Sequence, residues 1–262
     1  MQSYSTSDVF CALMQAPVVT VITVVFNGQQ FIERTLRSVQ AQRGVALEHL
    51  IIDGASKDGT LSIVERMKNA TTVVVSERDR GIYDAMNKGL AIARGTFVIF
   101  MNAGDEFADE MALSRAMDGN SRADFIYGNT LVVDERGTVL GDRRLSPPPQ
   151  LTWRSFNHGM CVSHQSMLVR RTLAVPFDLQ YKISADIDWT IRVLKQCKEI
   201  VNANAYIARF LEGGVSAARR KEGLKERFLI MRRHYGLIPT LINHLFIALR
   251  YPLQRVFRKS MT

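Results

Sequence analysis

Residues 18–28 read Val-Val-Thr-Val-Ile-Thr-Val-Val-Phe-Asn-Gly, and this stretch decides the fold class. Its run of apolar and β-branched residues predicts a buried strand, and Asn27-Gly28 predicts a turn at the carboxyl end of that strand. Pro17 stands immediately before the run, where the strand is expected to open. The first element is therefore expected to lie in the interior of a sheet.

The residues that follow alternate between helical and strand patterns. Apolar side chains recur at helical spacing in some segments and form short continuous runs in others. Strands are expected at residues 50–52, 73–75 and 97–101, and helices at 31–39, 61–67 and 82–94. Such an alternation over about 85 residues is typical of a parallel sheet with helices on both faces.

The second half of the chain has a more mixed pattern. Strands are expected at residues 125–128, 131–133, 138–140 and 167–169, and a helix at 186–198. The second and third of these strands predict a hairpin around residues 134–137, and Pro147 to Pro149 predict a loop. The predicted fold is α/β, with a mixed, mainly parallel sheet flanked by helices.

The positive charge of the protein is concentrated in its carboxyl-terminal part. The 262 residues contain 34 Lys or Arg and 25 Asp or Glu, a net charge of +9. Residues 215–262 hold eleven of the basic and two of the acidic residues, so the first 214 residues hold 23 of each sign. Because the domain itself is neutral, a nucleic-acid-binding function is not expected.

Composition and missing motifs exclude several other classes. Hydrophobic residues make up 47% and charged residues 23%, as in ordinary globular proteins. Three cysteines without a C-x-x-C motif argue against a disulfide scaffold or a cysteine zinc site. The glycine-rich dinucleotide fingerprint, the P-loop, the nucleophile elbow and H-E-x-x-H are absent from the sequence. Dehydrogenases, P-loop enzymes, α/β-hydrolases and zinc proteases are therefore disfavoured.

Targeting signals are also missing from the sequence. No apolar run reaches the length of about 20 residues that a membrane-spanning helix needs. Residues 1–16 lack the basic start and continuous apolar core of a secretory signal. A cytoplasmic location is therefore expected.

Polar residues follow the predicted strands of the first half, where each strand ends. They are Asn27, Asp53, residues 77–79 and residues 102–105. Ligands of open α/β sheets bind outside the carboxyl ends of the strands. This edge of the sheet is therefore the expected binding site.

Three ordered segments resemble family 2 glycosyltransferases with the GT-A fold. They are residues 21–27, residues 51–60 (Ile-Ile-Asp-Gly-Ala-Ser-Lys-Asp-Gly-Thr) and residues 76–89 (Ser-Glu-Arg-Asp-Arg-Gly-Ile-Tyr-Asp-Ala-Met-Asn-Lys-Gly). The third segment is similar to the branch that includes the WcaE-type colanic acid transferases. The resemblance continues through residues 100–105, 164–165, 184–186 and 213–216, and so covers about residues 18–216.

The resemblance implies a site for a nucleoside-diphosphate sugar in the first half. In the family, the aspartate that matches Asp53 accepts a hydrogen bond from the base, whereas a turn-capping Asp before Gly is the structural alternative. The other donor-binding residues are expected to be Val25, Asn27, Asp79, Asn102 and Asp105.

Asp105 matches the place of the family's aspartate-rich metal motif. It is expected to hold Mg²⁺ or Mn²⁺ together with waters and donor phosphates, and the ion would offset charge on the leaving diphosphate. Asn102 and Gly104 stand where the family keeps acids, so a weaker grip on the metal is expected. A simple glycine turn after the strand is the alternative.

Asp186 is the expected general base, because it opens a predicted helix as the family's acidic pair does. Ala185 replaces the first acid of that pair, and Asp188 is the second candidate for the base. A helix N-cap is the structural alternative for Asp186. His164 and Gln165 are expected on the acceptor side, where a purely structural role for the histidine is also open.

The basic tail suggests two interpretations. Basic residues at 219–221, 232–233 and 255–259 surround an apolar stretch at 237–249, which is too short to span a bilayer. A basic amphipathic helix on an anionic membrane is one interpretation. The other is a solvated helix that packs Leu241, Leu245 and Leu249 onto the domain.

Together these features predict an inverting glycosyltransferase of polysaccharide biosynthesis, peripheral at the cytoplasmic face of the membrane, that acts on a glycan or lipid-linked acceptor. Its parts are expected at residues 17–113 (nucleotide-sugar binding), 114–216 (acceptor binding and catalysis) and 217–262 (basic amphipathic helical tail). Two alternatives stay open. One is a sugar nucleotidyltransferase, disfavoured because residues 27–30 form neither a glycine-rich nor a basic loop. The other is a non-catalytic, membrane-associated nucleotide-binding adaptor.

Overall fold

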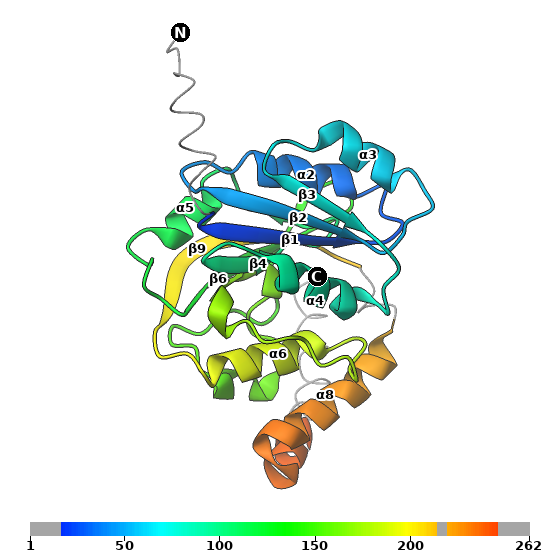
Figure 1. Ribbon diagram of the computed structural model, residues 1–262. Coiled ribbons are helices and arrows are strands. Elements are labelled where there is room, and N and C mark those ends of the chain that lie inside the picture. Colours follow the sequence, from blue (N-terminus) through cyan, green and yellow to red (C-terminus); the bar gives the residue numbers. More distant parts are fainter. Residues whose placement is uncertain (1–16, 214–218, 246–262) are drawn as a thin grey trace, which may run out of the picture.

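The computed structural model describes residues 17–213 and 219–245 (Figure 1). The strands are β1 (Val19–Val25), β2 (Leu47–Asp53), β3 (Thr72–Ser76), β4 (Phe97–Phe100), β5 (Glu106–Phe107), β6 (Phe125–Val133), β7 (Val139–Asp142), β8 (Met167–Arg170) and β9 (Ile200–Leu211). The helices are α2 (Ile32–Gln40), α3 (Thr60–Met67), α4 (Ile82–Ile92), α5 (Ala112–Met117), α6 (Ala185–Leu194) and α8 (Arg220–Tyr235), with short 3₁₀ turns η1 (Trp153–His158), η2 (His164–Ser166) and η3 (Arg171–Leu173).

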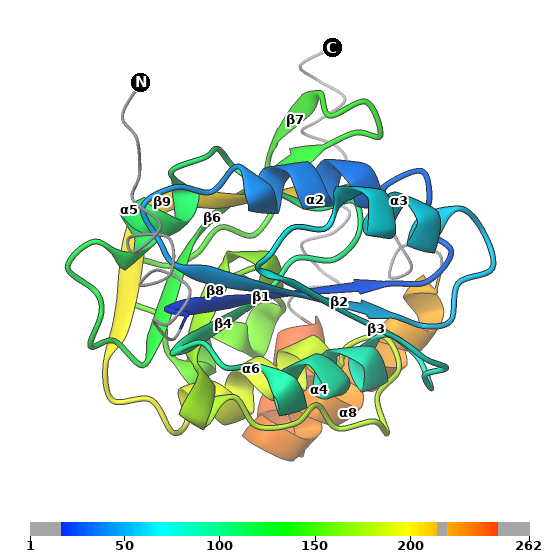
Figure 2. The same ribbon diagram turned by 45° about the horizontal axis from the view of Figure 1, so that its top comes forward.

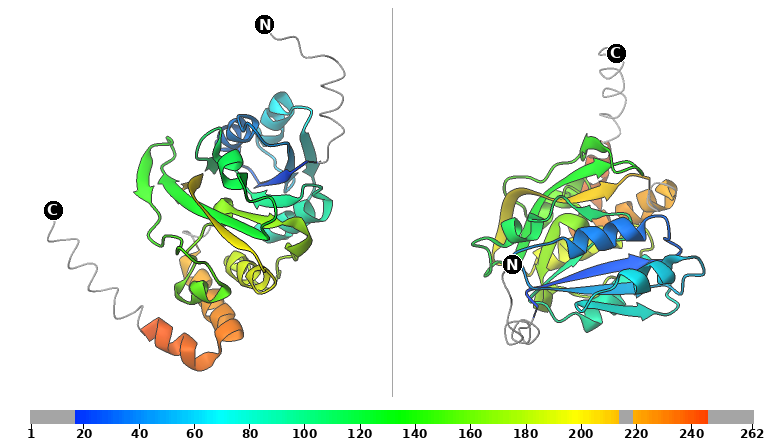
Figure 3. Two further views of the ribbon diagram at one scale, coloured as in Figure 1. Left: turned by 90° about the vertical axis from the view of Figure 1, so that its left-hand side faces the viewer. Right: turned by 90° about the horizontal axis from the view of Figure 1, so that it is seen from above.

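All of these strands belong to one sheet. Its order is β3-β2-β1-β4-β8-β6-β9-β5, and β7 pairs with β6 as a hairpin that projects from the domain (Figures 2 and 3). β1 runs parallel to β2 and β4, and β2 runs parallel to β3. Each antiparallel pair includes a strand of the second half: β8 with β4 and β6, β9 with β5, and β7 with β6. The structure confirms the predicted mixed α/β sheet.

Helices cover both faces of the sheet because the central strands are apolar on both sides. All seven residues of β1 are buried. Ile22 and Ile52 belong to the core cluster on the side of α4 and α6. Val25 and Ile51 belong to the cluster under α2 and α3, on the opposite face (Figure 2). Side chains that point to opposite faces of the same strand therefore pack in two different hydrophobic clusters, one on each side of the sheet.

The structure corrects several predicted boundaries. Residues 125–128 and 131–133 form one strand, β6, and the long strand β9 was not predicted. Most side chains of β9 are partly exposed, so its sequence does not need the apolar face that would have predicted a strand. The predicted helix at 186–198 ends at Leu194. Asp124 accepts hydrogen bonds from the backbone N–H groups of Lys198 and Glu199, which holds those residues outside the helix.

The carboxyl-terminal part is helical as far as the structure describes it. α8 packs against α6 (Figure 1), and residues 237–245 form a further helical segment. Leu241 and Leu245 are 51% and 61% exposed, so the interpretation that packs them onto the domain is wrong for these two residues. Leu249 and the basic residues 255–259 lie outside the described residues. Within residues 17–213 and 219–245, no helix has the length and hydrophobicity to cross a membrane.

Candidate active site

The polar residues predicted at strand ends meet at one edge of the sheet. β1, β2 and β4 are parallel, so Asn27, Asp53 and Asn102 lie at the same edge. β8 runs antiparallel to β4, which places η2, and with it His164, at this edge as well. The start of α6 joins them through the His164 and Asp186 side chains. The two halves of the chain therefore form one site.

Asp53 is a buried carboxylate at the end of β2. Its Oδ2 accepts hydrogen bonds from the Ser56 backbone N–H (3.0 Å) and the Ser76 hydroxyl (2.7 Å). Its Oδ1 is buried and has no hydrogen-bond partner in the described part of the chain. A buried carboxylate oxygen without a partner is costly, and an N–H group of a ligand would satisfy it.

Phe26 and Asp79 lie close to Gly54, the residue after Asp53. Asp79 Oδ1 accepts a hydrogen bond from the Gly81 N–H, and a Cβ at Gly54 would lie 2.5 Å from Asp79 Oδ2 and 3.3 Å from the Phe26 ring. Gly54 thus allows both side chains to approach the end of β2. Phe26 is 63% exposed, and sequence reasoning missed it because it read this residue as the end of an apolar run.

Two of the predicted donor-site residues have structural roles. Val25 is buried in the core with Ile32 and Leu36, so its side chain does not face the site. Asn27 has a left-handed backbone (φ 48°), and its Oδ1 accepts a hydrogen bond from the Lys57 N–H at 2.9 Å. Asn27 therefore joins the loop after β1 to the loop after β2, at the edge where a ligand would bind.

Asn102 connects the end of β4 to His164 and, through it, to Asp186. Its Nδ2 lies 3.1 Å from His164 Nε2. An amide N–H can only donate, so His164 Nε2 accepts and the ring proton is on Nδ1. That nitrogen lies 3.6 Å from Asp186 Oδ2. Asn102 Oδ1 is buried and has no hydrogen-bond partner within residues 17–213 and 219–245, so it is available to a ligand.

Asp186 is a partly exposed carboxylate at this edge. Its side chain is 20% exposed at the start of α6, and the Tyr83 hydroxyl lies 3.3 Å from its Oδ1. Burial alone would raise the pKa of Asp186, but His164, the Arg227 charge and the Ile187 N–H together outweigh burial and lower the pKa. The carboxylate is therefore ionised at neutral pH.

A residue that sequence reasoning missed holds the segment before Asp186 in place. The Glu226 carboxylate of α8 accepts hydrogen bonds from three consecutive backbone N–H groups, those of Lys182, Ile183 and Ser184, at 2.7–2.9 Å. α8 therefore helps to position the start of α6. Nothing in the local sequence around Glu226 indicates this contact, because it joins residues more than 40 positions apart.

Gln165 and Asp105 contact each other inside the domain. Gln165 is 1% exposed, and its Nε2 donates to Asp105 Oδ2 at 2.6 Å. The predicted acceptor-side role for Gln165 is therefore wrong, because its side chain is enclosed. Asp105 is 4% exposed, and its Oδ1 accepts a hydrogen bond from the Leu211 N–H. Burial raises the pKa of Asp105 to about 6.

This arrangement does not fit Asp105 as a direct metal ligand. Both of its oxygens point to donors inside the domain, whereas a ligand to Mg²⁺ or Mn²⁺ must face the cation. The partnerless Asn102 Oδ1 is the oxygen that fits a cation at this edge. Within the described ranges, no group of three or more His, Cys, Asp or Glu side chains is arranged to hold a metal ion.

Comparison with known sequences agrees with this geometry. The sequence pattern of Glycosyl transferase family 2 matches residues 20–174, more than half of the chain. The chain belongs to glycosyltransferase family 2. It is an enzyme of the transferase class, as the sequence resemblance predicted.

Two curated relatives cover nearly the whole chain. An uncharacterized glycosyltransferase of Mycobacterium tuberculosis is 28% identical over 246 residues, which are 90% of this chain and 92% of the relative. A putative teichuronic acid biosynthesis glycosyltransferase of Bacillus subtilis, TuaG, is 26% identical over 231 residues, 84% of this chain and 90% of the relative.

Solved structures confirm the fold. The structure of S. aureus TarS 1–349 in complex with UDP-GlcNAc has a TM-score of 0.65 at 18% identity and covers 86% of this chain and 72% of its own. The mannosyltransferase PcManGT of Pyrobaculum calidifontis, in complex with GDP-Man and Mn²⁺, has a TM-score of 0.59 at 18% identity and covers 95% and 80%. This glycosyltransferase therefore has the GT-A fold that the sequence predicted.

Asp188 does not face the acceptor side of this glycosyltransferase. It is fully buried between α6 and α8, where it pairs with Arg192 (Nε to Oδ2, 2.7 Å) and His234 (Nε2 to Oδ1, 2.8 Å). Residues two apart on a helix point in different directions, so Asp186 faces the site and Asp188 faces α8. The prediction of Asp188 as an alternative base is therefore wrong.

Replacing Asp188 with asparagine is expected to destabilise the protein by about 3–5 kcal/mol, because it leaves Arg192 and His234 without their buried partner. Urea unfolding at neutral pH measures the loss. Asp178→Asn is the matched control, since Asp178 is 30% exposed and pairs with Arg233 at 3.0 Å. That exposed pair should contribute less than about 1 kcal/mol. Equal losses for the two variants would contradict the structural role of Asp188.

The buried Asp105 carboxylate predicts a pH dependence of stability. Its pKa is about 6 in the folded protein against an ordinary value of 3.8, so the folded state holds the proton more tightly. Asp105 therefore stabilises the fold below about pH 4 and loses this contribution as the pH rises through 6, a change of about 3 kcal/mol.

Urea unfolding of wild type and Asp105→Asn across this pH range isolates the contribution of Asp105. The stability of the wild type relative to the variant should fall as the pH rises. A wild-type stability that rises relative to Asp105→Asn over the same range would contradict the buried environment of Asp105.

Proposed function

We propose that this enzyme is an inverting glycosyltransferase that transfers a sugar from a nucleoside-diphosphate sugar to an acceptor hydroxyl. One observation supports this most directly. A buried carboxylate oxygen that lacks a partner, Asp53 Oδ1, and an ionised carboxylate that reaches solvent, Asp186, share one edge of the sheet. The first suits the N–H group of a base, and the second suits a hydroxyl proton.

The residues have distinct roles in the proposed reaction. The acceptor hydroxyl gives its proton to Asp186 as its oxygen attacks the anomeric carbon. The bond from that carbon to the diphosphate breaks, and the nucleoside diphosphate leaves with the electron pair on the opposite face. His164 Nδ1–H holds the Asp186 carboxylate, and Asn102 keeps the His164 proton on that nitrogen.

A divalent cation is part of the proposal. The solved structure of PcManGT contains Mn²⁺ with GDP-Man. In this chain Asn102 Oδ1 would hold the cation together with the donor phosphates, and Asp105 would support the edge from inside through Gln165. When bound, such an ion supplies positive charge that stabilises the leaving diphosphate.

The acceptor is proposed to be a growing glycan or a lipid-linked glycan of an extracellular or capsular polysaccharide. The relative TuaG, a putative teichuronic acid biosynthesis glycosyltransferase, supports this class. Within the family, we place the chain near the WcaE-type colanic acid transferases on the basis of residues 76–89.

An anionic membrane surface at the cytoplasmic face is the proposed partner of the tail. Leu237, Ile238, Leu241, Ile242 and Leu245 are 49–72% exposed in the described helical segment. The sequence on both sides of this segment is rich in Lys and Arg. Exposed apolar side chains beside positive charge suit a membrane interface.

A thermal-shift panel tests the donor site. The full chain is heated with UDP, GDP, dTDP or CMP, each with and without Mn²⁺. A nucleotide at 100 times its dissociation constant should stabilise the fold by about 2.7 kcal/mol. We expect one diphosphate to shift the melting temperature more with Mn²⁺ than without it. No shift with any nucleotide would overturn the proposed donor site.

A further inference from the structure

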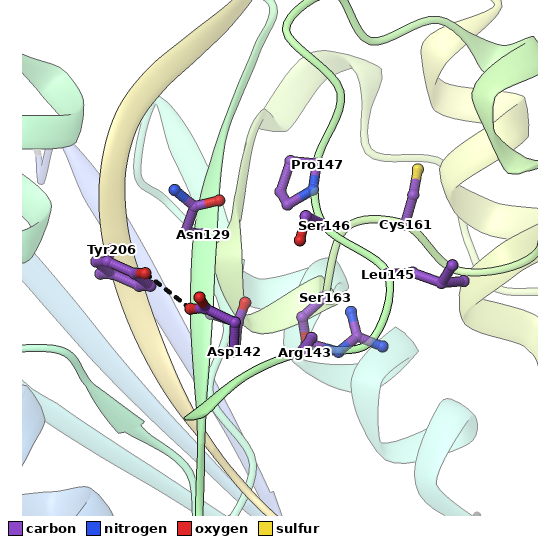
Figure 4. Close-up of a pocket in the computed structure, with 10 residues that line it drawn as sticks. Asn129, Asp142, Arg143, Leu145, Ser146, Pro147, Cys161, Ser163 and Tyr206 are labelled. Atoms are coloured by element: carbon purple, nitrogen blue, oxygen red, sulfur yellow. Dashed lines mark hydrogen bonds between the residues drawn. The ribbon is translucent and has the colours of Figure 1, made fainter. Parts of the chain in front are cut away.

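A pocket of about 150 Å³ lies beside the active site, between the β6–β7 hairpin and the loop that leads to η2 (Figure 4). Asn129 and Thr130 of β6 line one side, and Cys161 and Ser163 line another. The Arg143 side chain comes from the segment that follows β7. The predicted donor and acceptor residues do not include any residue of this pocket.

Arg143 has an unsatisfied donor in this pocket. Its Nη1 is buried and has no hydrogen-bond partner among the residues that the structure describes. Burial lowers the pKa of Arg143, the Asp186 charge opposes this effect, and the nearby Arg227 and Arg144 add repulsion. A buried guanidinium N–H without an acceptor is costly, so the site is suited to an incoming anion.

The acids and thiol of the pocket do not supply that acceptor. The Asp142 carboxylate turns toward β9, where its Oδ1 accepts a hydrogen bond from the Tyr206 hydroxyl at 2.7 Å (Figure 4). Burial raises the pKa of the Cys161 thiol to about 11, so that group is neutral. Asp186 is the acid that faces Arg143, and the proposed reaction uses it as the base.

The pocket lies on the acceptor side of the site. Asp53 follows β2, and the order β2-β1-β4-β8-β6 places Asn102 (after β4) and His164 (before β8) between it and β6. Thr130 of β6 contacts Ser166 of η2 through their hydroxyl groups at 2.7 Å, which fixes the pocket next to His164. A group in the pocket is therefore on the far side of His164 and Asn102 from Asp53.

We propose that this pocket binds an oxyanion of the acceptor, a carboxylate or a phosphate ester, through Arg143. This inference rests on the proposed function, because it names the class of acceptor that the enzyme takes. The anion on Arg143 would hold the acceptor with its hydroxyl at Asp186. Hydrogen-bond donors and acceptors on Asn129, Thr130 and Ser163 would surround the sugar ring that bears the anion.

The test measures binding of three small probes by ligand-observed NMR titration, with saturating nucleotide present to occupy the donor site. The probes are methyl β-D-glucuronide, glucose 6-phosphate and the neutral methyl β-D-glucoside. The variants are Arg143→Gln and, as a matched control, Arg144→Gln, which removes the exposed neighbouring charge. Arg143→Lys keeps the charge without the fork of donors. The melting temperature of each variant is measured alongside.

We expect at least one anionic probe to bind wild type more tightly than the glucoside does. Arg143→Gln should weaken that probe by about tenfold or more, and Arg143→Lys should weaken it less. Arg144→Gln should change the affinity of that probe by less than about twofold, because it removes an exposed charge outside the pocket. The anionic probe that binds more tightly shows whether the acceptor group is a carboxylate or a phosphate ester. Arg143→Gln should melt no lower than wild type, since it removes a buried donor that lacks an acceptor.

Two outcomes would overturn the proposal. The first is that neither anionic probe binds better than the glucoside, or that Arg143→Gln leaves their affinity unchanged. The second is that Arg143→Gln weakens UDP or another active nucleotide as much as it weakens the probes, which would assign Arg143 to the donor diphosphate. Failure of all nucleotides to bind, with Arg143-dependent binding of the probes intact, would instead overturn the donor site alone.

Discussion

Replacing Asp186 with asparagine is expected to lower the rate of sugar transfer by about 10²- to 10⁴-fold, because an amide cannot take the proton of the acceptor hydroxyl. The side chain keeps its size and its place at the start of α6, so the fold should be retained. The thermal-shift panel identifies the nucleotide that binds. The rate is then measured as release of that nucleoside diphosphate from the corresponding nucleotide sugar. Nucleotide affinity should stay within about twofold of wild type, since Asp186 lies on the catalytic side of Asn102.

The control for this experiment is the histidine that holds Asp186. His164→Asn leaves the carboxylate present but removes the Nδ1–H group that lies 3.6 Å from it. Its rate should fall by less than that of Asp186→Asn, and its pH–rate profile should shift because His164 lowers the pKa of Asp186. A transfer rate for Asp186→Asn close to wild type would exclude Asp186 as the base.

Replacing Asp53 with asparagine is expected to weaken nucleotide binding by about 10- to 100-fold. The carboxylate accepts at both oxygens, whereas the amide accepts at one. The variant must therefore lose either the contact to the base or the hydrogen bonds from Ser56 and Ser76. Isothermal titration with the nucleotide that shifts the melting temperature measures the loss.

Ser76→Ala is the matched control for Asp53. It removes one hydrogen bond to Oδ2 and leaves Oδ1 free for the base, so its effect on nucleotide affinity should be smaller. If Asp53→Asn binds nucleotide as tightly as wild type, then Asp53 is only a turn residue, which was the structural alternative from the sequence.

The neutral domain and its basic tail affect how these assays are run. Since exposed apolar residues of the segment 237–245 reach solvent, the full chain should be assayed with vesicles present and absent. The variants above lie in the part of the chain before this segment, so their relative effects should be the same in both conditions.

The sequence alone determined the architecture and the edge where the site lies. Runs such as residues 18–26 and 97–101 are apolar along their length, and only a strand covered on both faces buries such a run. The carboxyl ends of parallel strands lie at one edge of a sheet. Asp53 ends one such strand and Asn102 follows another, so both residues lie at that edge. The family 2 resemblance followed from the order of these motifs, and the match over residues 20–174 confirms it.

Only the tertiary structure decided which of the polar side chains are free to act. Asp186 and Asp188 are two positions apart and were the first and second candidates for the base in sequence, but α8 covers Asp188 and leaves Asp186 partly exposed. Asp105 and Gln165 were predicted to face ligands, yet they bind each other across 60 positions. Glu226 of α8 holds the backbone just before Asp186, and Arg143 shares its pocket with Cys161 and Ser163 from a later loop. Local periodicity reports which face of an element is buried, whereas the freedom of a single carboxylate depends on contacts between segments that only the packed chain brings together.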